Sequence, residues 1–166
     1  MKISNDTRDV LKNFSTINSG IKVTSGKQLQ TISNMKNILA VATIEEEFPQ
    51  DFSIYNLPEF LGATSLLEDA DFQFGDASVT ISDTNSALAY FYASEGMVTT
   101  PEKMITMPDA EVSFDVSSSL LNDLNKAASV LGVNDLILKS DGTTMTLLVT
   151  DKKNTTSNSF SRTVGT

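Results

Sequence analysis

Residues 51–74 read DFSIYNLPEFLGATSLLEDADFQF, and this stretch decides the architecture that we expect for the chain. Its first five residues alternate polar and apolar side chains, which is typical of a strand with one buried face. Asn56 is a good N-cap, Pro58 lies in the first helical turn, and an acidic residue follows at the reciprocal position of a capping box, so a helix is predicted over residues 57–67. Strand-like alternation resumes at residue 71. A strand, a capped helix and a second strand therefore follow one another directly.

The same order of a helix followed by strands is predicted at both ends of the chain. Ser4 can cap an amphipathic helix that Asn18-Ser19-Gly20 ends, and Ser117 can cap a helix that runs to about Leu131. Further strands are predicted at residues 21–24, 29–33, 38–44, 79–82, 87–92, 112–115, 135–139, 143–151 and 159–164. We expect the run Glu45-Glu46-Glu47 to end the strand predicted at residues 38–44. The pattern predicts three helix-then-strands units and a quasi-symmetric α+β fold with helices on one side.

The residue types that the sequence lacks exclude several classes of active site. The 166 residues include no His and no Cys, whereas a serine or cysteine triad, a zinc site and haem ligation of the usual kinds need one or the other. Neither of the glycine-rich phosphate-binding patterns occurs. The polar N-terminus has no apolar run long enough for a signal peptide or a membrane span. We therefore expect a soluble, intracellular, non-enzymatic protein without cofactors.

Charge is distributed unevenly along the chain. The total is -9, but residues 1–36 carry +4, residues 37–102 carry -12 without a single Lys or Arg, and residues 103–166 carry -1. A local basic surface on an acidic body can bind an anion selectively, although an acidic protein also shows such unevenness by chance. The charge pattern alone therefore leaves both interpretations open.

Clusters of carboxylates are the only candidate catalytic or metal-binding groups. The candidates are Glu68, Asp69, Asp71 and Asp76, together with the run of three Glu at residues 45–47. Paired carboxylates can hold Mg²⁺ or act as acid and base. Acidic residues are also ordinary at a turn between a helix and a strand, and the spacing fits no calcium loop. A structural role is therefore favoured over a metal-assisted hydrolase, and no metal site is expected.

Basic residues on two predicted helices indicate a binding function more clearly than the carboxylates indicate a catalytic one. Arg8 and Lys12 lie about 40° apart on the first helix, opposite its apolar face, and Lys126 lies on the polar face of the third helix. Cations held at modest density can follow the charged backbone of a nucleic acid. These three side chains are the candidate phosphate contacts.

Two long segments resemble a known family. The opening MKISNDTRDVLKNFSTINSGI (residues 1–21) and DFSIYNLPEFLGATSLLEDA (residues 51–70) are similar to the DNA polymerase sliding clamp of T4-like bacteriophages. The similarity can be followed with decreasing sharpness through the helix that ends at Leu131. It implies a sliding-clamp fold of repeated half-domains, with antiparallel sheets outside and helices lining one face.

The resemblance also implies an organisation into domains. Residues 1–94 would form an N-terminal clamp domain, residues 95–110 an interdomain connector and residues 111–166 a partial second clamp domain. Family chains continue past the equivalent of Thr166 with further strands of the second domain. We therefore expect a shortened clamp without one edge of the contact that closes the ring.

The function implied by the resemblance is that of a ring-forming processivity factor, which encircles duplex DNA and tethers the replicative polymerase in the host cytoplasm. Arg8, Lys12 and Lys126 would face the DNA without sequence preference. Residues 97–108 would border an apolar pocket for the C-terminal peptide of the polymerase, with Met104, Ile105 and Met107 contributing to it. The implied partners include a clamp loader and, as further candidates, late-transcription factors, and a closed ring would be a homotrimer. The alternative from the residues alone is an acidic protein-interaction module that does not bind DNA.

Overall fold

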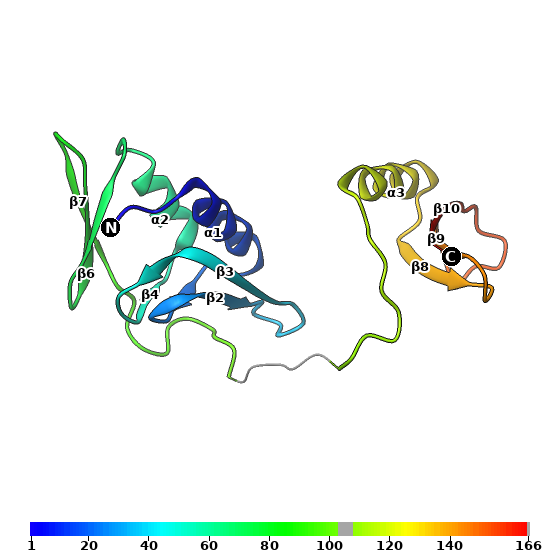
Figure 1. The fold of residues 1–166 in the computed structure, drawn as a ribbon, viewed down its shortest axis with the longest axis horizontal. Helices are drawn as coiled ribbons and strands as arrows, with labels where there is room; N and C mark the ends of the chain where they lie inside the picture. The colour runs from blue at the N-terminus through cyan, green and yellow to red at the C-terminus, as the bar shows by residue number, and fades with distance from the viewer. Residues whose placement is uncertain (103–107, 166) are drawn as a thin grey trace. The chain divides into compact units, whose positions relative to one another are not determined.

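The computed structural model describes residues 1–102 and 108–165, which divide into two compact units. The first unit is Met1–Ile105 and the second is Thr106–Thr166 (Figure 1). Each unit has its own cluster of buried apolar side chains. None of the helices in the described residues has the length and apolar character needed to cross a membrane.

The first unit combines two helices with short antiparallel strands in its described part. Strand β1 pairs with β4, β2 pairs with β3, and β5, β6 and β7 form a three-stranded sheet with β6 in the middle. Helix α1 packs against α2 and against β3. The elements are α1 (Asn5–Ile17), β1 (Ile21–Val23), β2 (Gly26–Ile32), β3 (Leu39–Phe48), β4 (Phe52–Ile54), α2 (Leu57–Thr64), β5 (Asp71–Phe74), β6 (Ser78–Ser82) and β7 (Ala87–Phe91).

Strand β3 corrects one prediction from the sequence. The acidic run at residues 45–47 was predicted to interrupt the strand, but β3 continues through it to Phe48. Alternation along the strand buries Ile44 and Phe48 and leaves Glu45 and Glu47 exposed to solvent. The run is tolerated because two of its three side chains lie on the solvent face.

Both helices of the first unit begin at the caps that the sequence predicts. The Thr7 backbone N–H donates to the Ser4 hydroxyl over 3.2 Å at the start of α1, and the Glu59 backbone N–H donates to the Asn56 side-chain oxygen over 3.2 Å at the start of α2. The Glu59 carboxylate accepts from the Asn56 side-chain amide, at 3.2 Å. Helix α2 ends at Thr64 and is therefore shorter than predicted.

One core joins the two helices to the sheets of the first unit. Phe74 of β5 lies with its ring centroid 5.8 Å from that of Phe48 and 5.3 Å from that of Phe52, which flank the turn between β3 and β4. Val79 and Ile81 of the central strand β6 are fully buried in the same core. Residues from both the α1 half and the α2 half of the unit therefore share one apolar interior.

The second unit is a single helix followed by a three-stranded antiparallel sheet. The described elements are α3 (Ser118–Leu131), β8 (Asp135–Ser140), β9 (Met145–Thr150) and β10 (Phe160–Gly165), and β9 is the central strand. The Ser117 hydroxyl accepts from the Leu120 N–H over 3.2 Å, and Gly132 ends the helix at a φ of 66°. Left-handed backbone of this kind favours glycine because it carries no Cβ.

The predicted strand at residues 112–115 is wrong. These residues take no part in a β-ladder, although Phe114 among them packs against the core of the second unit. Alternating apolar residues without a neighbouring chain to accept their backbone hydrogen bonds do not form a sheet.

Candidate nucleic-acid interface

Two of the three predicted DNA contacts line a groove between α1 and α2. Its volume is about 440 Å³, and Arg8 and Lys12 line it from α1 while Pro58, Gly62 and Ser65 line it from the region of α2. The groove lies where α2 packs alongside α1, and the small residues Gly62 and Ser65 are among those that line it beside Leu61. Small residues leave space next to the cations that larger side chains would fill.

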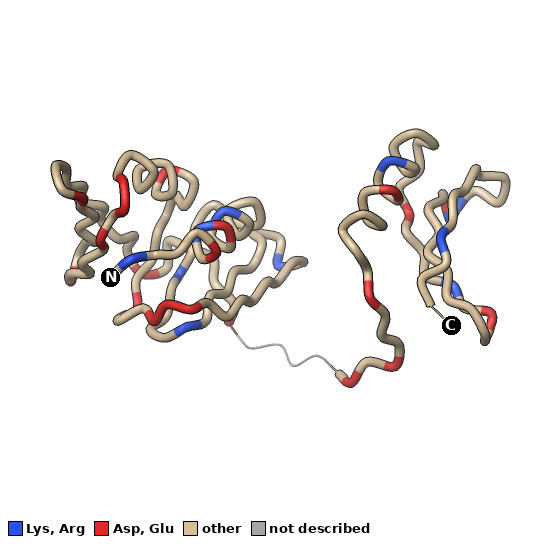
Figure 2. Tube along the Cα trace, turned by 45° about the horizontal axis from the view of Figure 1, so that its top comes forward, with Lys and Arg blue, Asp and Glu red and all other residues tan. Residues whose placement is uncertain are grey.

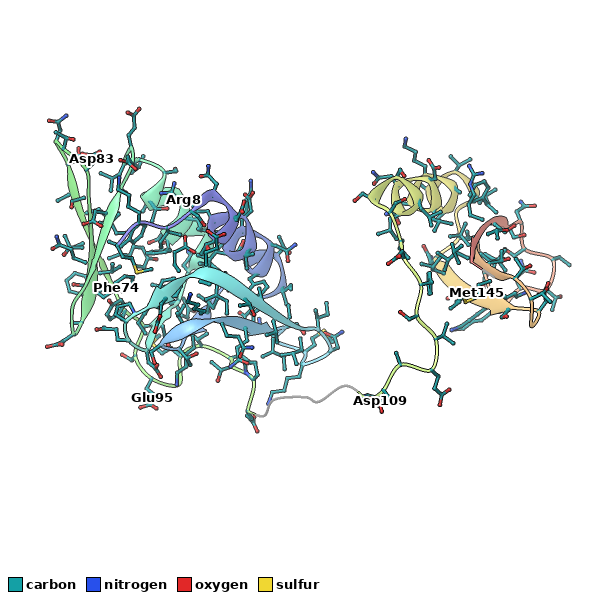
Figure 3. The ribbon with its side chains drawn as sticks, viewed as in Figure 1. Arg8, Phe74, Asp83, Glu95, Asp109 and Met145 are labelled. Atoms are coloured by element: carbon teal, nitrogen blue, oxygen red, sulfur yellow. The ribbon has the colours of Figure 1, made fainter. Side chains whose placement is uncertain are left out.

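Arg8 is less exposed than its position on a helical wheel predicts. Figure 3 labels Arg8 on α1. Lys12 is exposed, but Arg8 is only half-exposed and its Nε is buried without a hydrogen-bond partner in the described structure. The burial of the Arg8 Nε is an effect of tertiary packing that the periodicity of α1 alone cannot show. This burial restricts the guanidinium to the neighbourhood of the groove.

Acidic residues accompany the two cations. Helix α1 carries Asp6 and Asp9 together with Arg8 and Lys12, and Asp9 also lines the groove. Basic and acidic positions therefore alternate along α1 (Figure 2). The helix as a whole is neutral, so its attraction to a polyanion depends on which side chains point towards it.

Glu46 fixes the start of α1 from the neighbouring strand. Its carboxylate accepts hydrogen bonds from the Ser4 backbone N–H and, at 2.5 Å, from the Thr7 hydroxyl. Burial raises the pKa of Glu46, and the hydrogen bonds from Thr7 and Ser4 outweigh it and lower the pKa to about 2. A negative charge beside the first turn of a helix is also favoured by the helix dipole. Glu46 therefore anchors the helix that carries both groove cations, and the sequence analysis missed this role.

The other predicted DNA contact, Lys126, belongs to the second unit. Lys126 is exposed on α3 in the second unit, near Asp123 on the same helix. Met104, Ile105 and Met107 lie outside the described residues, so the structure does not test their predicted contribution to a peptide pocket.

A second hollow lies beside the first residues of the predicted connector. It has a volume of about 530 Å³ and is lined by Tyr55, Tyr90, Phe91 and Met97, among others. Tyr55, Phe91 and Met97 are 61%, 72% and 56% exposed, which is unusual for large apolar side chains. The alternation of β7 could have indicated that Phe91 points outward, because it follows the exposed Ala87 and Ala89 on one face of that strand.

Tyr90 links this second hollow to α2. Its hydroxyl donates to the Asn56 carbonyl over 3.2 Å and its ring packs edge-on against Phe60, with centroids 5.1 Å apart. Burial and the nearby Glu59 carboxylate raise the pKa of Tyr90. The phenol is therefore neutral at physiological pH and can donate a hydrogen bond at the rim of the hollow.

Two of the four candidate carboxylates near residue 70 have structural partners. The amino group of Met1 lies 2.6 Å from Asp71, a hydrogen bond that lowers the pKa of that carboxyl, and Lys2 pairs with Asp69. Asp69 has a φ of 51°, which places it in a tight turn. Among the residues that the structure describes, no three acidic side chains gather in a geometry that could hold a metal ion. The ion pairs of Asp69 and Asp71 therefore favour a structural role for these two residues.

Comparison with known proteins decides the family. The model of the DNA polymerase processivity factor family matches residues 4–99, which include both helices that line the groove. The chain belongs to this family.

Relatives within the family carry the name sliding clamp. Sliding clamps from Vibrio phage KVP40, Escherichia phage RB69 and Enterobacteria phage T4 are 33%, 33% and 34% identical to the chain. The similar regions cover 99%, 86% and 83% of this chain, and 77%, 64% and 61% of the respective relatives. The resemblance to phage sliding clamps in the sequence is confirmed.

Solved structures identify the same fold at low sequence identity. The proliferating cellular nuclear antigen of Entamoeba histolytica is similar with a TM-score of 0.59 at 15% identity, over 95% of this chain and 69% of that protein. The β clamp of H. pylori is similar with a TM-score of 0.52 at 17% identity, over 99% of this chain and 54% of that protein. These likenesses confirm the predicted sliding-clamp fold of the processivity factor.

Proposed function

We propose that this processivity factor is a ring-forming sliding clamp that encircles duplex DNA and tethers the replicative polymerase. The observation that carries the proposal is the family match over residues 4–99 together with the groove that Arg8 and Lys12 line inside that region. The proposal assigns no catalytic step to the chain.

In this proposal the helices meet the DNA backbone. Arg8 and Lys12 in the groove and Lys126 on α3 contact phosphates without reading base edges, so binding is independent of sequence. The acidic residues of segment 37–102 repel DNA from surfaces outside the groove. The closed ring would be a homotrimer in the host cytoplasm, assembled on DNA by a clamp loader.

The hollow beside the connector is the proposed site for the C-terminal peptide of the polymerase. Its exposed Tyr55, Phe91 and Met97 offer aromatic and flexible apolar contacts, which are suited to short peptides of varied sequence. Met104, Ile105 and Met107 follow closely in the chain, and their contribution to the peptide site stays a prediction from the sequence. Late-transcription factors are further candidates for this site.

Retention on circular DNA tests the encircling proposal. The protein is loaded by its clamp loader onto nicked circular duplex, and the retained fraction is measured before and after linearisation. Retention that is lost on linearisation supports a ring. Equal retention on both forms would overturn encirclement. A chain that binds the polymerase peptide but is never retained on DNA would instead be the acidic interaction module.

A salt titration tests the assigned DNA contacts. Each lost phosphate contact lowers the slope of log affinity against log salt by about 0.9 on duplex DNA. Lys12→Ala is expected to show this loss, and Lys27→Ala is the matched control because Lys27 is an exposed residue of strand β2. Identical slopes for both variants would remove Lys12 from the interface.

A peptide titration tests the hollow independently of DNA. Phe91→Ala is expected to weaken binding of a polymerase C-terminal peptide by about tenfold or more, as truncation of an anchoring aromatic side chain does. Val41→Ala serves as the control, since Val41 is also exposed, at 45%, but lies on β3 outside the hollow. Equal effects of the two variants would place the peptide elsewhere.

A further inference from the structure

Strand β7 leads into a segment, residues 93–99, that stays attached to the first unit, and we name this segment the strap. At its beginning, the Ala93 N–H donates to the carbonyl of Ser53 in β4 over 2.8 Å. At its end, the Thr99 carbonyl accepts from the side-chain amide of Asn18 over 3.2 Å. The strap is therefore fixed at both ends to residues that lie far from it in the sequence.

The middle of the strap is a tight turn. The Met97 N–H donates to the Ser94 carbonyl over 3.2 Å, and Gly96 between them has a φ of 83°. A positive φ at the third position of a four-residue turn is typical of a type II turn and favours glycine. Glu95, labelled in Figure 3, is exposed in this turn, whereas Met97 lines the same hollow as Phe91. The position of Met97 therefore depends on how the two ends of the strap are held.

Asn18 is the side chain that holds the second end. It is only 6% exposed. Its amide nitrogen donates to the Ile32 carbonyl over 2.9 Å as well as to the Thr99 carbonyl, and its oxygen accepts from the Gly20 N–H over 3.1 Å. A primary amide has two N–H donors, so both are used. Asn18 thus joins the end of α1, the end of β2 and the strap at one junction.

A close approach at Gly20 adds a packing contact to this junction. Gly20 is buried, and a Cβ placed on it would lie 3.1 Å from Cγ1 of Val98 and 3.2 Å from the carbonyl oxygen of Tyr55. Carbon atoms in favourable contact lie about 3.5–4.0 Å apart, so a side chain at this position would push against Val98. The strap therefore packs directly on the glycine backbone, two residues after Asn18.

An ion pair that follows the strap is a weaker attachment. The Lys36 Nζ lies 2.8 Å from the Glu102 carboxylate, but the two side chains are 57% and 78% exposed. Exposed ion pairs contribute little because water and salt compete with them. Loss of the Asn18 amide, in contrast, would leave carbonyl groups beside a buried position without their donor, which is costly. The Asn18 junction therefore determines where the strap lies.

We propose that Asn18 is a positioning residue of the peptide site: it holds the strap against the end of α1 and so keeps Met97 in the hollow that Phe91 lines. Asn18 does not line the hollow in the described structure, so it acts through the backbone of the strap. A surface that is ordered before binding avoids the entropic cost of being ordered by its ligand, so the junction raises the affinity for an apolar peptide. The inference rests on the proposed peptide-binding function of the hollow.

Hydrogen exchange, followed by NMR, tests the attachment without any partner. Asn18→Asp keeps the shape and the acceptor oxygen of the side chain but replaces both N–H donors by a carboxylate oxygen. Exchange of the Ala93 and Met97 amides is expected to accelerate about tenfold or more, whereas the Ile81 amide of the central strand β6 stays protected. Asn13→Asp introduces the same charge at an exposed position of α1 and should leave all three amides unchanged.

A double-mutant cycle on peptide affinity tests the positioning role. A fluorescent synthetic peptide of the polymerase C-terminus is titrated with the wild-type chain, Asn18→Asp, Met97→Ala and the double variant. Asn18→Asp is expected to weaken binding about tenfold in the wild-type chain. In the Met97→Ala background it should weaken binding by no more than about twofold, because the strap then carries no side chain to position. A general loss of stability would lower the affinity equally in both backgrounds.

The outcomes separate this inference from the proposed function. Unchanged exchange of the strap amides in Asn18→Asp, or equal losses of affinity in both backgrounds, would overturn the inference. A loss of affinity for Phe91→Ala without one for Asn18→Asp would overturn the inference alone, whereas a wild-type chain that binds no peptide would overturn the function of the hollow as well. If circular dichroism shows that Asn18→Asp is unfolded, Val98→Ala replaces it in both experiments, because it loosens the strap at Gly20 without a buried charge.

Discussion

Replacing Glu46 by Gln is expected to destabilise the first unit through the start of α1. Glu46 accepts from the Ser4 N–H and the Thr7 hydroxyl, and the Thr7 side chain is buried. A glutamine oxygen can still accept from one of these donors, so the geometry is preserved and the main loss is the charge. Glu46→Gln therefore isolates the electrostatic part of the contact.

The size of the effect follows from the pKa of Glu46. Burial raises this pKa, the hydrogen bonds from Thr7 and Ser4 outweigh it, and the result is a decrease from 4.5 to about 2. If the whole decrease in pKa contributed to stability, it would add about 3 kcal/mol to the free energy of unfolding. Solvent screening of the half-exposed carboxylate reduces this contribution to about 1–2 kcal/mol. Because the pKa is lower in the folded state, the stabilisation is complete above pH 4.5 and is lost as the pH falls towards 2.

Urea unfolding followed by tyrosine emission measures this loss in the relevant unit. All three tyrosines lie in the first unit and the chain has no Trp, so the signal reports that unit alone. We expect Glu46→Gln to lose about 1–2 kcal/mol at pH 7 and progressively less below pH 4.5. The exposed neighbour Glu47→Gln is the control and should change little. A Glu46→Gln deficit that is the same at pH 7 and pH 3 would refute the electrostatic explanation.

Three further predictions concern other parts of the chain. Gly132→Ala places a Cβ at a φ of 66° and should destabilise the second unit by about 1 kcal/mol. Circular dichroism during urea unfolding measures this loss, and an unchanged unfolding midpoint would contradict the left-handed end of α3. The Asp141 carboxylate accepts hydrogen bonds from the Thr143 hydroxyl and from the backbone N–H groups of Thr143 and Thr144, and these bonds lower its pKa to about 2. An NMR titration should therefore show this carboxylate ionised down to about that pH. A titration midpoint near 4 would show that this turn is not formed in solution. Ile81→Ala removes a completely buried side chain and should destabilise the first unit by about 2–5 kcal/mol in the tyrosine assay, while a loss below 1 kcal/mol would contradict its burial.

Local signals in the sequence predicted the helices well because each helix is specified by its own ends. Ser4, Asn56 and Ser117 cap the three helices as expected, and Gly132 ends the third. The errors lie where the outcome depends on a partner strand. Three consecutive glutamates continue β3 because β2 supplies the ladder and the pleat directs two of them to solvent, while residues 112–115 have the alternation of a strand but no partner.

The candidate site was predictable to a lesser extent, because it depends on contacts between elements. Helical periodicity placed Arg8 and Lys12 near each other, but the groove forms only where α2 packs against α1, and the burial of the Arg8 Nε depends on the tertiary structure. The role of Glu46 links residues about forty positions apart, which no local pattern reveals. The hollow at Phe91 likewise combines α2, β7 and the first connector residues, three segments that are separate in the sequence.

The electrostatics of α1 bear directly on how a clamp of this family would hold DNA. Two cations in the groove are balanced by two carboxylates on the same helix, within a chain of net charge -9. Each phosphate contact contributes a slope of only about 0.9 in log affinity against log salt, so a few such contacts hold DNA weakly at physiological salt. Weak, sequence-independent contacts allow movement along the duplex, but they cannot by themselves keep a protein on it. Persistence must then come from enclosure, so the surfaces that join one copy to the next determine the proposed function more than the strength of any contact to DNA.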